Sequence, residues 1–390
     1  MIAPPYDVVD TAEARTLAAG NPDSFLRISR PEIDLAEVGA HTDAHTDEVY
    51  ALGRANLDEF VRRGVLLRDE APGLLVYRQR MGDAVQTGVV GCATVEEYRR
   101  GLIATHEHTR PDKETDRTRH IDALGAHDEP VFLMYRPGAP GAAEVADVVG
   151  QVVAGTPEYD VTAEGVQHTV WRVAADLVQE LVDAFARIPL LYVSDGHHRC
   201  AAAARVAELR PEEGAREFPT VVFPADQLTI LGYNRVVRDL AGRDPEGLLA
   251  ELEDAFRVEP SPAAPEPGRH QFGAYLGGAW WLLTARPGVV DESDPIGRLD
   301  VSVLTQRVLD PILGITDQRT DTRIAFVGGI RGTDELERLV DSGDFAVAFA
   351  LHPTSPGEVM DVADLGQVMP PKSTWFEPKL RSGFFVHPID

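Results

Sequence analysis

Apolar residues recur at helical spacing in several parts of the chain. The segment from Thr46 to Leu67 places Val49, Leu52, Leu57, Phe60 and Val61 on one side, which predicts an amphipathic helix. A shorter helix is expected to open at Asp10, because Asp10 and Glu13 have the spacing of a capping box, and to stop before Gly20. Further helices are predicted over 112–126, 141–152, 174–188, 201–209, 245–256, 301–309 and 333–340.

Short apolar or alternating runs between these helices predict strands. The first two, 74–78 and 85–91, are expected to pair around the turn at Met81-Gly82-Asp83. Others are predicted near 131–135, 167–173, 190–194, 220–223, 229–237, 280–283, 324–327 and 345–351. Because strands and helices mix without strict alternation, we expect an α+β (mixed α/β) fold.

The length of 390 residues predicts two or three domains. Residues 258–268 carry four prolines and are interpreted as a loop or linker. The expected organisation is an N-terminal α/β region over 1–189, a core over 190–257, this linker, and a C-terminal α/β region over 269–390.

The composition excludes some classes of protein and argues against some partners. An apolar fraction of 44% excludes disorder of the whole chain. With 63 acidic against 37 basic residues the net charge is -26, and such a surface repels nucleic-acid backbones, so no nucleic-acid partner is expected. Two cysteines, no secretion signal and no bilayer-length apolar stretch predict a cytoplasmic protein without a membrane partner.

The sharpest local motif is Ser194-Asp-Gly-His-His-Arg199, which follows a buried strand and opens an alanine-rich helix. The amides of a helix N-terminus carry partial positive charge and form a seat for phosphate, which Gly196 lets approach closely. Arg199 is a bidentate phosphate partner, and Asp195 can either cap the helix or hold Mg²⁺.

A second motif, His106-Glu107-His108, precedes a charged helix. Glu107 is a candidate general base, because a partly desolvated carboxylate between imidazoles can take a proton from a hydroxyl. A zinc site with two histidines from each motif is the rival, which spacing disfavours because His106 and His108 alternate on a strand and His197 and His198 diverge.

A third motif is Pro371-Lys372-Ser373-Thr374, in a chain with lysine only at 113, 372 and 379. An ammonium group, two hydroxyls and consecutive amides could close over a polyphosphate. The alternative is a C-terminal edge strand whose Trp375 and Phe376 pack on the core. Neither a P-loop nor a kinase glycine-rich loop is present, so phosphate chemistry here needs another scaffold.

Together the three motifs resemble those of free L-serine kinases built on the ParB/sulfiredoxin-like fold. The whole chain also resembles a wide bacterial family known as a domain of unknown function, through Ala3-Pro-Pro-Tyr-Asp-Val-Val9, Asn21-Pro-Asp-Ser-Phe-Leu-Arg27 and Met369-Pro-Pro-Lys-Ser-Thr374. The resemblance implies a ParB/sulfiredoxin-like nucleotide-binding core with inserted and appended segments.

The resemblance also implies roles. Glu107 would deprotonate the hydroxyl of free L-serine, and Asp195 would bind that hydroxyl or Mg²⁺. Gly196, His197, His198 and Arg199 would hold the transferring phosphoryl group, with His198 counted among the catalytic residues. Lys372, Ser373 and Thr374 would bind the phosphates of ATP or ADP, whichever is the donor.

The amino-acid substrate needs its own contacts. By resemblance, Tyr233 is the nearest equivalent of an aromatic residue that lines the amino-acid pocket of the kinases. Tyr6, Asp7 and Arg27, from the N-terminal motifs, are candidates for the ammonium and carboxylate groups.

Two alternatives to a serine kinase stay open. One is a ParB-like nucleotide-binding switch without a small-molecule acceptor, against which the acidic composition argues. The other is a kinase for a different hydroxylated amino acid or small alcohol.

Overall fold

The computed structural model describes residues 1–35 and 45–389 and contains two compact units. The first unit comprises Met1–Leu228 together with the C-terminal residues from Pro378, and the second unit comprises Thr229–Glu377.

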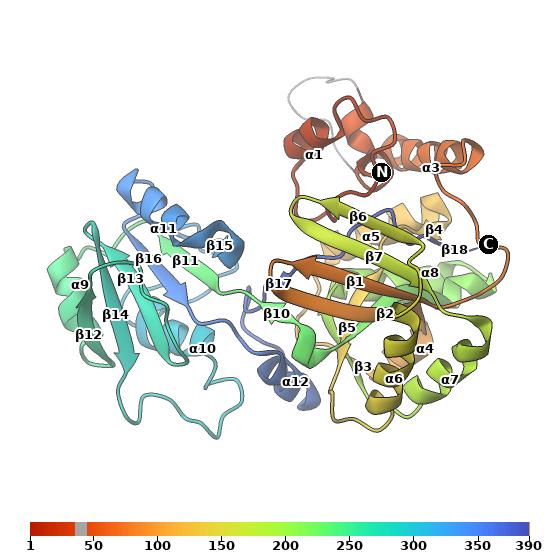
Figure 1. Ribbon diagram of the computed structural model, residues 1–390. Coiled ribbons are helices and arrows are strands. Elements are labelled where there is room, and N and C mark those ends of the chain that lie inside the picture. The colour runs from red at the N-terminus through yellow and green to blue at the C-terminus, as the bar shows by residue number, and fades with distance from the viewer. Residues whose placement is uncertain (36–44, 390) are drawn as a thin grey trace. The chain divides into compact units, whose positions relative to one another are not determined.

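The first unit contains an eight-stranded sheet in the order β3-β8-β5-β9-β2-β1-β7-β6 (Figure 1). Its strands are β1 (Leu75–Met81), β2 (Ala84–Thr94), β3 (Ile103–Ala104), β5 (Val131–Tyr135), β6 (Tyr159–Ala163), β7 (Val166–Arg172), β8 (Leu191–Asp195) and β9 (Glu217–Pro224). The pairs β3–β8 and β5–β9 are parallel, and the other neighbours are antiparallel.

Helices cover one face of this sheet and also build a separate N-terminal layer (Figure 1). They are α1 (Thr11–Ala18), α2 (Leu26–Ser29), α3 (Asp47–Arg62), α4 (Val95–Arg99), α5 (Pro111–Leu124), α6 (Ala142–Val153), α7 (Ala175–Phe185) and α8 (His197–Leu209). Apolar residues of α6, α7 and α8 share one core with alternate residues of the strands, among them Val148, Leu181, Ala203, Leu133 and Val193. This core fixes α8 against the sheet.

The residues after Pro378 pack on the sheet as well. Gln79 and Gln86 donate to the carbonyls of Lys379 and Pro378, and Tyr77 packs against Phe384. The chain then ends in β18 (His387–Pro388), which pairs with β4 (Ala126–His127). The end of the sequence is thereby placed beside segments from its first third.

The second unit has a six-stranded antiparallel sheet in the order β12-β14-β13-β16-β11-β15. Its strands are β11 (Tyr233–Val237), β12 (Phe256–Ser261), β13 (Gln271–Leu276), β14 (Ala279–Ala285), β15 (Ile324–Gly328) and β16 (Val347–Leu351), and β10 (Thr229–Ile230) pairs separately with β17 (Phe376–Glu377). Its helices are α9 (Pro245–Leu252), α10 (Asp300–Leu304), α11 (Gly332–Asp341) and α12 (Pro356–Asp364). Shorter helical segments in the two units are Pro31–Asp34, Glu213–Arg216, Ala225–Gln227, Gly329–Arg331 and a π-helical turn over Thr305–Leu309.

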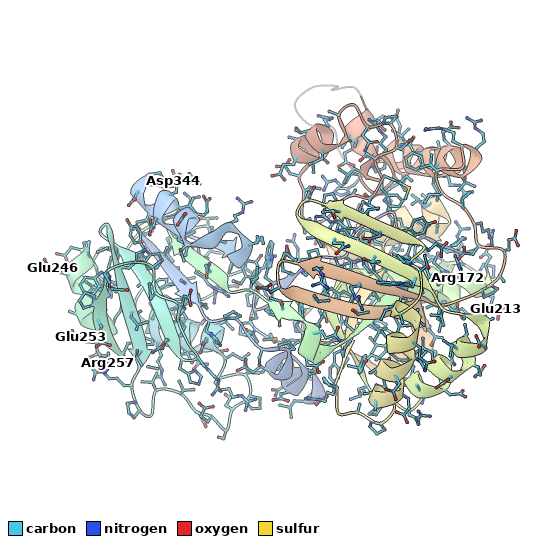
Figure 2. All side chains as sticks on the ribbon, viewed as in Figure 1. Arg172, Glu213, Glu246, Glu253, Arg257 and Asp344 are labelled. Atoms are coloured by element: carbon cyan, nitrogen blue, oxygen red, sulfur yellow. The ribbon has the colours of Figure 1, made fainter. Side chains whose placement is uncertain are left out.

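Both units carry charged side chains over their surfaces, as Figure 2 shows for Arg172 and Glu213 in the first unit and Glu246, Glu253 and Asp344 in the second. Each unit has buried clusters of apolar side chains in its interior. This separation is what the composition predicted for a globular chain.

The expected α+β class is confirmed, and so are most predicted elements. The capping box at Asp10 is present, with both reciprocal hydrogen bonds. The prediction for 258–268 was wrong in part, because residues up to Ser261 form β12. Pro260 is tolerated there because β12 is an edge strand, where one side of the backbone needs no partner. The elements that were not predicted are strands β3, β4, β6, β13, β17 and β18 and helices α2, α4 and α12.

The compact units divide the chain differently from the predicted domains. Their boundaries follow Leu228 and Glu377, whereas the predicted regions meet at the 258–268 segment. The region expected over 269–390 is divided between the units, because hydrogen bonds to β1 and β2 hold the residues from Pro378 on the first sheet.

Candidate functional site

The site is built where β8 ends and α8 begins. Gly196 adopts a left-handed conformation with φ 102°, and a Cβ atom there would lie 2.9 Å from Nε of Arg199. Gly196 is the N-cap of α8, and in the described chain no side chain caps this helix. The amides of the first turn therefore face the site with their partial positive charge, as the sequence predicted.

Parallel pairing brings Glu107 to the same place. Strand β3 runs parallel to β8, with Ala104 opposite Tyr192, so the carboxyl ends of the two strands meet at one edge of the sheet. Glu107 follows β3, and its Oε2 lies 4.0 Å from Nδ1 of His197. Glu107 therefore lies beside the turn at 195–199.

The structure defines the protonation states of His106 and His197 beside Glu107. The backbone N–H of His106 donates to Nε2 of His197 at 3.4 Å, so the ring proton of a neutral His197 lies on Nδ1, which faces Glu107. The two rings meet edge to face with centroids 4.5 Å apart. Burial lowers the pKa of both residues, to about 4 for His106, and keeps them neutral at pH 7.

His198 points to a different partner. Its Nε2 accepts a hydrogen bond of 3.0 Å from the backbone N–H of Arg110, which leaves the proton of the neutral ring on Nδ1. Burial lowers its pKa, so His198 is also neutral at pH 7. The expected divergence of His197 and His198 is confirmed.

Asp195 does not cap α8. One oxygen accepts a 2.6 Å hydrogen bond from Nζ of Lys379, and the other accepts one of 2.5 Å from Arg199. Burial by itself would raise the pKa of Asp195, but the charges of Lys379 and Arg199 outweigh it and hold the pKa well below its ordinary value. The capping alternative for Asp195 was therefore wrong, because its carboxylate is drawn toward two cations.

Lys379 was not predicted as a site residue. Its side chain is partly buried beside Asp195. It reaches this position because the residues after Pro378 lie on the sheet of the first unit. The scarcity of lysine was a signal that could have singled it out.

Arg199 continues the network into the interior. It donates to the carbonyl of Pro130 and lies 3.8 Å from Oε2 of Glu129. Glu129 accepts hydrogen bonds through Oε1 from the Tyr6 backbone at 3.0 Å and from Ser382 at 2.6 Å. Burial raises the pKa of Glu129 to about 7, against the opposing effect of Arg199.

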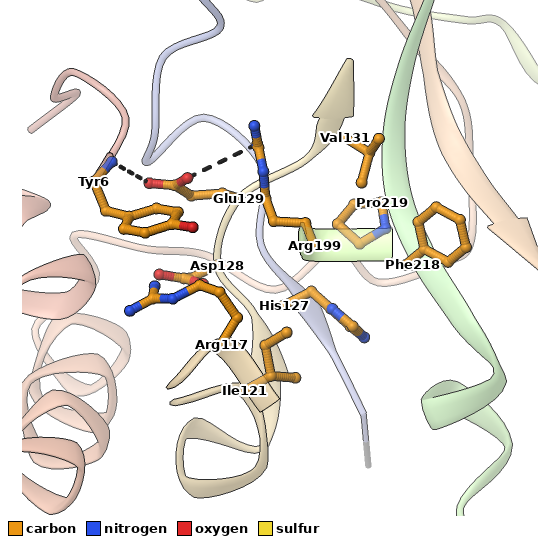
Figure 3. A pocket seen from close by; sticks show the side chains of 10 residues that line it. All are labelled: Tyr6, Arg117, Ile121, His127, Asp128, Glu129, Val131, Arg199, Phe218 and Pro219. Carbon is orange, nitrogen blue, oxygen red and sulfur yellow. Dashed lines mark hydrogen bonds and ion pairs between the residues drawn. The ribbon is translucent and has the colours of Figure 1, made fainter. Parts of the chain in front are cut away.

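A small pocket borders this network (Figure 3). Its lining comprises Tyr6, Arg117, Ile121, His127, Asp128, Glu129, Val131, Arg199, Phe218 and Pro219. The guanidinium of Arg117 lies over the Tyr6 ring, 3.8 Å from its centroid. The N-terminal motif is thereby joined to the charged interior of the site.

The three N-terminal residues expected to bind the amino acid, Tyr6, Asp7 and Arg27, do not all lie at the site. Tyr6 is buried in the network, and the charge of Asp7 acts on both His198 and Arg199, so the two residues lie at the site. Arg27 instead bonds to Asp34 and to the carbonyls of Asn21 and Ala18 within the N-terminal segment. Its assigned role in binding substrate stays a prediction.

The first unit offers one set of possible metal ligands at the site. Ligand atoms of His106, Glu107 and His197 lie within 4.8 Å of one another, a combination of one carboxylate with one imidazole from each motif. Mg²⁺ prefers oxygen ligands, and both oxygens of Asp195 are already held by cations. Asp195 therefore does not fit a magnesium ligand in this arrangement, and no step is derived through a metal.

The third motif lies in the second unit. Lys372 has a positive φ of 57°, and its Nζ lies 5.8 Å from the ring centroid of Tyr233. Arg235, which is fully buried, donates to the carbonyls of Pro371 and Lys372 at 3.2 and 3.0 Å. Lys372 thus lies in a turn, and the strand of the alternative begins only after the motif, where Phe376 is buried in β17.

The hydroxyl of Ser373 forms a hydrogen bond within the turn, since it donates to the carbonyl of Pro370 at 2.6 Å. The placement of Lys372, Ser373 and Thr374 near nucleotide phosphates stays a prediction. Each of these residues belongs to the second unit, whereas Glu107 and Asp195 belong to the first.

The fold and the site define an α+β protein with a carboxylate beside a helix N-terminus that no side chain caps among the described residues. The chain belongs to the family described as "Protein of unknown function (DUF1015)", whose model matches residues 1–302. The expected membership in a family of this kind is confirmed. No curated protein matches the sequence.

Solved structures are similar at low identity. A free serine kinase in complex with AMP is 13% identical, with a TM-score of 0.38, covering 74% of this chain and 86% of that chain. A variant of a free serine kinase in complex with ADP is 14% identical, with a TM-score of 0.36 and coverages of 74% and 87%. C-terminally truncated SbnI from Staphylococcus aureus is 13% identical, with a TM-score of 0.40 and coverages of 75% and 85%.

Within the described residues, every helix is too short or too polar to cross a membrane.

Proposed function

We propose that this protein is a nucleotide-dependent kinase that phosphorylates the hydroxyl of free L-serine to give O-phosphoserine. The observation that carries the proposal is the position of Glu107 beside the N-terminus of α8, with 4.0 Å between Oε2 and Nδ1 of His197. A base and an anion seat at one point are the two parts that phosphoryl transfer to an alcohol requires. The resemblance of the three motifs to those of free L-serine kinases supports the choice of substrate.

In the proposed reaction Glu107 accepts the proton of the serine hydroxyl. The hydroxyl oxygen forms a bond to the terminal phosphorus of ATP or ADP, and the bond from that phosphorus to the bridging oxygen breaks. The leaving nucleotide keeps the bonding electrons, giving ADP or AMP. The proton on Glu107 passes to water after the product leaves.

The charge on the transferring phosphoryl group needs a positive environment. The amides of Gly196, His197 and His198 would provide one, since the start of α8 has no side-chain cap in the described chain. Asp195 and Arg199 would hold the turn in place through their mutual ion pair. Lys372 and Thr374 are proposed to contact the nucleotide when it is bound.

The neutral histidines fit this scheme. His197 directs its Nδ1 proton toward Glu107 and would orient the carboxylate, and His198 has an Nδ1 proton to donate to a phosphate oxygen. Tyr6 and Asp7 are proposed to bind the amino acid, because Asp7 supplies an anion for its ammonium group.

A phosphate-transfer assay tests the proposal. The purified full-length protein is incubated with ATP or ADP, Mg²⁺ and a panel of free amino acids, and the products are analysed by mass spectrometry. We expect O-phosphoserine in amounts equal to the nucleotide consumed, and we expect Glu107→Gln to lower kcat at least about 100-fold. Glu144→Gln is the matched control, since Glu144 lies on α6 and pairs with Arg187, which follows α7, away from the site.

Two outcomes would contradict the proposal. Full turnover by Glu107→Gln would remove the assigned base. Hydrolysis of the nucleotide with no phosphorylated amino acid would instead support a nucleotide-binding switch, and phosphorylation of another hydroxyl compound would replace serine as the substrate.

A further inference from the structure

A second cluster of metal-binding side chains lies in the first unit, apart from the site described above. It contains Cys92 of β2, Glu217 of β9 and His387 of β18, and their ligand atoms all lie within 4.8 Å of one another. Three segments that are distant in the sequence thus contribute one sulfur, one oxygen and one nitrogen ligand.

The sheet register explains why two of these residues meet. Cys92 lies directly opposite Pro219 in the antiparallel pair of β2 and β9. Glu217 is two residues before Pro219, so its side chain emerges on the same face of the sheet, diagonally across from Cys92. The third residue, His387, arrives through the pairing of β18 with β4.

The separation of two ligand atoms already matches a bound metal. Sγ of Cys92 lies 3.5 Å from Nδ1 of His387. In a tetrahedral zinc site, Zn–S and Zn–N bonds of ordinary length place sulfur and nitrogen about 3.6 Å apart. The pair can therefore take a zinc ion with little movement.

The imidazole is also oriented for this role. Nε2 of His387 donates to the carbonyl of Gly214 at 3.4 Å, which leaves the lone pair of Nδ1 directed to the cluster. A backbone carbonyl that holds the far nitrogen of a histidine is a typical outer contact of metal sites. The ring of His127 stacks on that of His387 with centroids 6.2 Å apart and restrains it further.

The histidine that stacks on His387 has an unsatisfied ring nitrogen. His127 is 4% exposed, and its Nε2 is buried without a hydrogen-bond partner among the described residues. Such a group is costly to bury unless something completes its hydrogen bonding. A water molecule bound to a metal next to His387 could supply that hydrogen bond.

We propose that Cys92, Glu217 and His387 bind one Zn²⁺ ion, with water in the fourth position. Thiolate, imidazole and carboxylate together select zinc over magnesium or calcium, which take oxygen ligands. The ion would join the C-terminal strand β18 to β2 and β9, and it would stabilise the folded first unit by mass action. The proposal is independent of the kinase activity.

Cobalt titration of the metal-depleted full-length protein tests the site. Co²⁺ bound by a thiolate gives a near-ultraviolet charge-transfer absorption that nitrogen and oxygen ligands alone do not give. We expect this band to saturate at one equivalent and to disappear when Zn²⁺ is added. Cys92→Ser should abolish the band, and His387→Gln and Glu217→Gln should each weaken binding at least about tenfold.

Cys200→Ala and Glu213→Gln are the matched controls. Cys200 is the other cysteine of the chain and lies on α8 with its side chain buried in the core, and Glu213 is exposed near Glu217. Both controls should keep the band and should keep the rise in melting temperature that Zn²⁺ produces, with circular dichroism confirming that each variant folds. An absent band, or metal affinity and thermal shift unchanged in Cys92→Ser, would overturn the proposal. Binding without the thiolate band would assign the metal to other ligands, such as the His106, Glu107 and His197 group, and would overturn it equally.

Discussion

Nζ of Lys379 lies 2.6 Å from Oδ1 of Asp195, although 184 positions separate the two residues in the sequence. This contact joins the C-terminal segment to the turn that opens α8. It also places a positive charge beside the proposed phosphate seat, in a protein with only three lysines. Stability and activity of the site should therefore depend on the same ion pair.

Replacement of Lys379 by glutamine should destabilise the first unit. Asp195 would keep only Arg199 as a cationic partner, so its pKa should rise and the free energy of unfolding should fall by about 1–3 kcal/mol. Because the pKa of Asp195 is lowered in the folded protein, its contribution is present above the ordinary pKa and is lost as pH falls through the folded value. Urea unfolding between neutral and acidic pH measures both effects.

The matched control is Lys113→Gln, because Lys113 is exposed in the first turn of α5. Its unfolding free energy should change by less than about 0.5 kcal/mol. Equal effects of the two substitutions would contradict a structural role for the Lys379–Asp195 pair.

The buried carboxyl group of Glu129 should make stability depend on pH in the opposite direction. Its pKa is raised from 4.5 to about 7, so between these values the folded state holds a proton that the unfolded state has released. Stability should therefore be greatest below pH 4.5 for this group and should fall as pH rises toward 7, by up to about 1.4 kcal/mol per pH unit.

The variant Glu129→Gln isolates this effect. Its amide oxygen can accept the same hydrogen bonds from Tyr6 and Ser382, but the side chain does not titrate. The difference in unfolding free energy between the wild type and the variant should shrink or reverse from pH 5 to pH 7. Parallel curves for the two proteins would show that Glu129 is ionised throughout.

Gly196→Ala should damage the turn itself. Alanine is strained at φ 102°, and its Cβ would press on the guanidinium of Arg199 at 2.9 Å. We expect a loss of about 1–3 kcal/mol in unfolding free energy and a loss of turnover, measured by denaturation and by the phosphate-transfer assay.

A second glycine provides the comparison. Gly150 lies inside α6. A Cβ atom at this position would meet no described atom within 4 Å outside its own helix backbone and chain neighbours, so Gly150→Ala should stabilise the helix by about 0.5–1 kcal/mol. If both substitutions have the same effect, the left-handed conformation at Gly196 has no special role.

Arg235 should act as a positioning residue for the Pro-Lys-Ser-Thr motif of the second unit. Arg235→Met removes the donors to the carbonyls of Pro371 and Lys372, and the turn should loosen. Hydrogen exchange should accelerate in a peptide covering residues 369–376, and the KM for nucleotide should rise by about tenfold to a hundredfold while the KM for serine changes less.

Arg238→Met is the control for this experiment. Arg238 follows the same strand but is exposed and donates to the carbonyls of Thr322 and Asp344. Exchange in residues 369–376 should match the wild type in this variant. Arg235→Lys should rescue only part of the effect. Nη2 of Arg235 donates to the carbonyls of Pro371 and Lys372 while Nη1 donates to that of Tyr233, and a single ammonium group replaces only one of these two nitrogens.

Most of the local structure could be predicted from the sequence. The capping box at Asp10, the hairpin around Gly82 and the strand-turn-helix at Gly196 depend on residues within a few positions of one another. Periodicity missed β6, whose residues are largely exposed. The prolines of 258–268 favoured a loop at β12, where Pro260 occupies an edge strand. In both cases the strand is stabilised by pairing with a neighbour rather than by its own pattern.

The sequence by itself determined which residues are available at the site: a glycine that permits the turn, a helix that begins directly after it, and a carboxylate between histidines. Only the tertiary structure decided which partners these residues have. Glu107 lies near His197, and Asp195 is paired with Lys379 and Arg199. The contact between Cys92 and His387 also depends on the tertiary structure. Backbone geometry and capping depend on neighbours along the chain, and residue types reveal them directly. The register of distant strands depends on how the whole core packs, and no short motif records it.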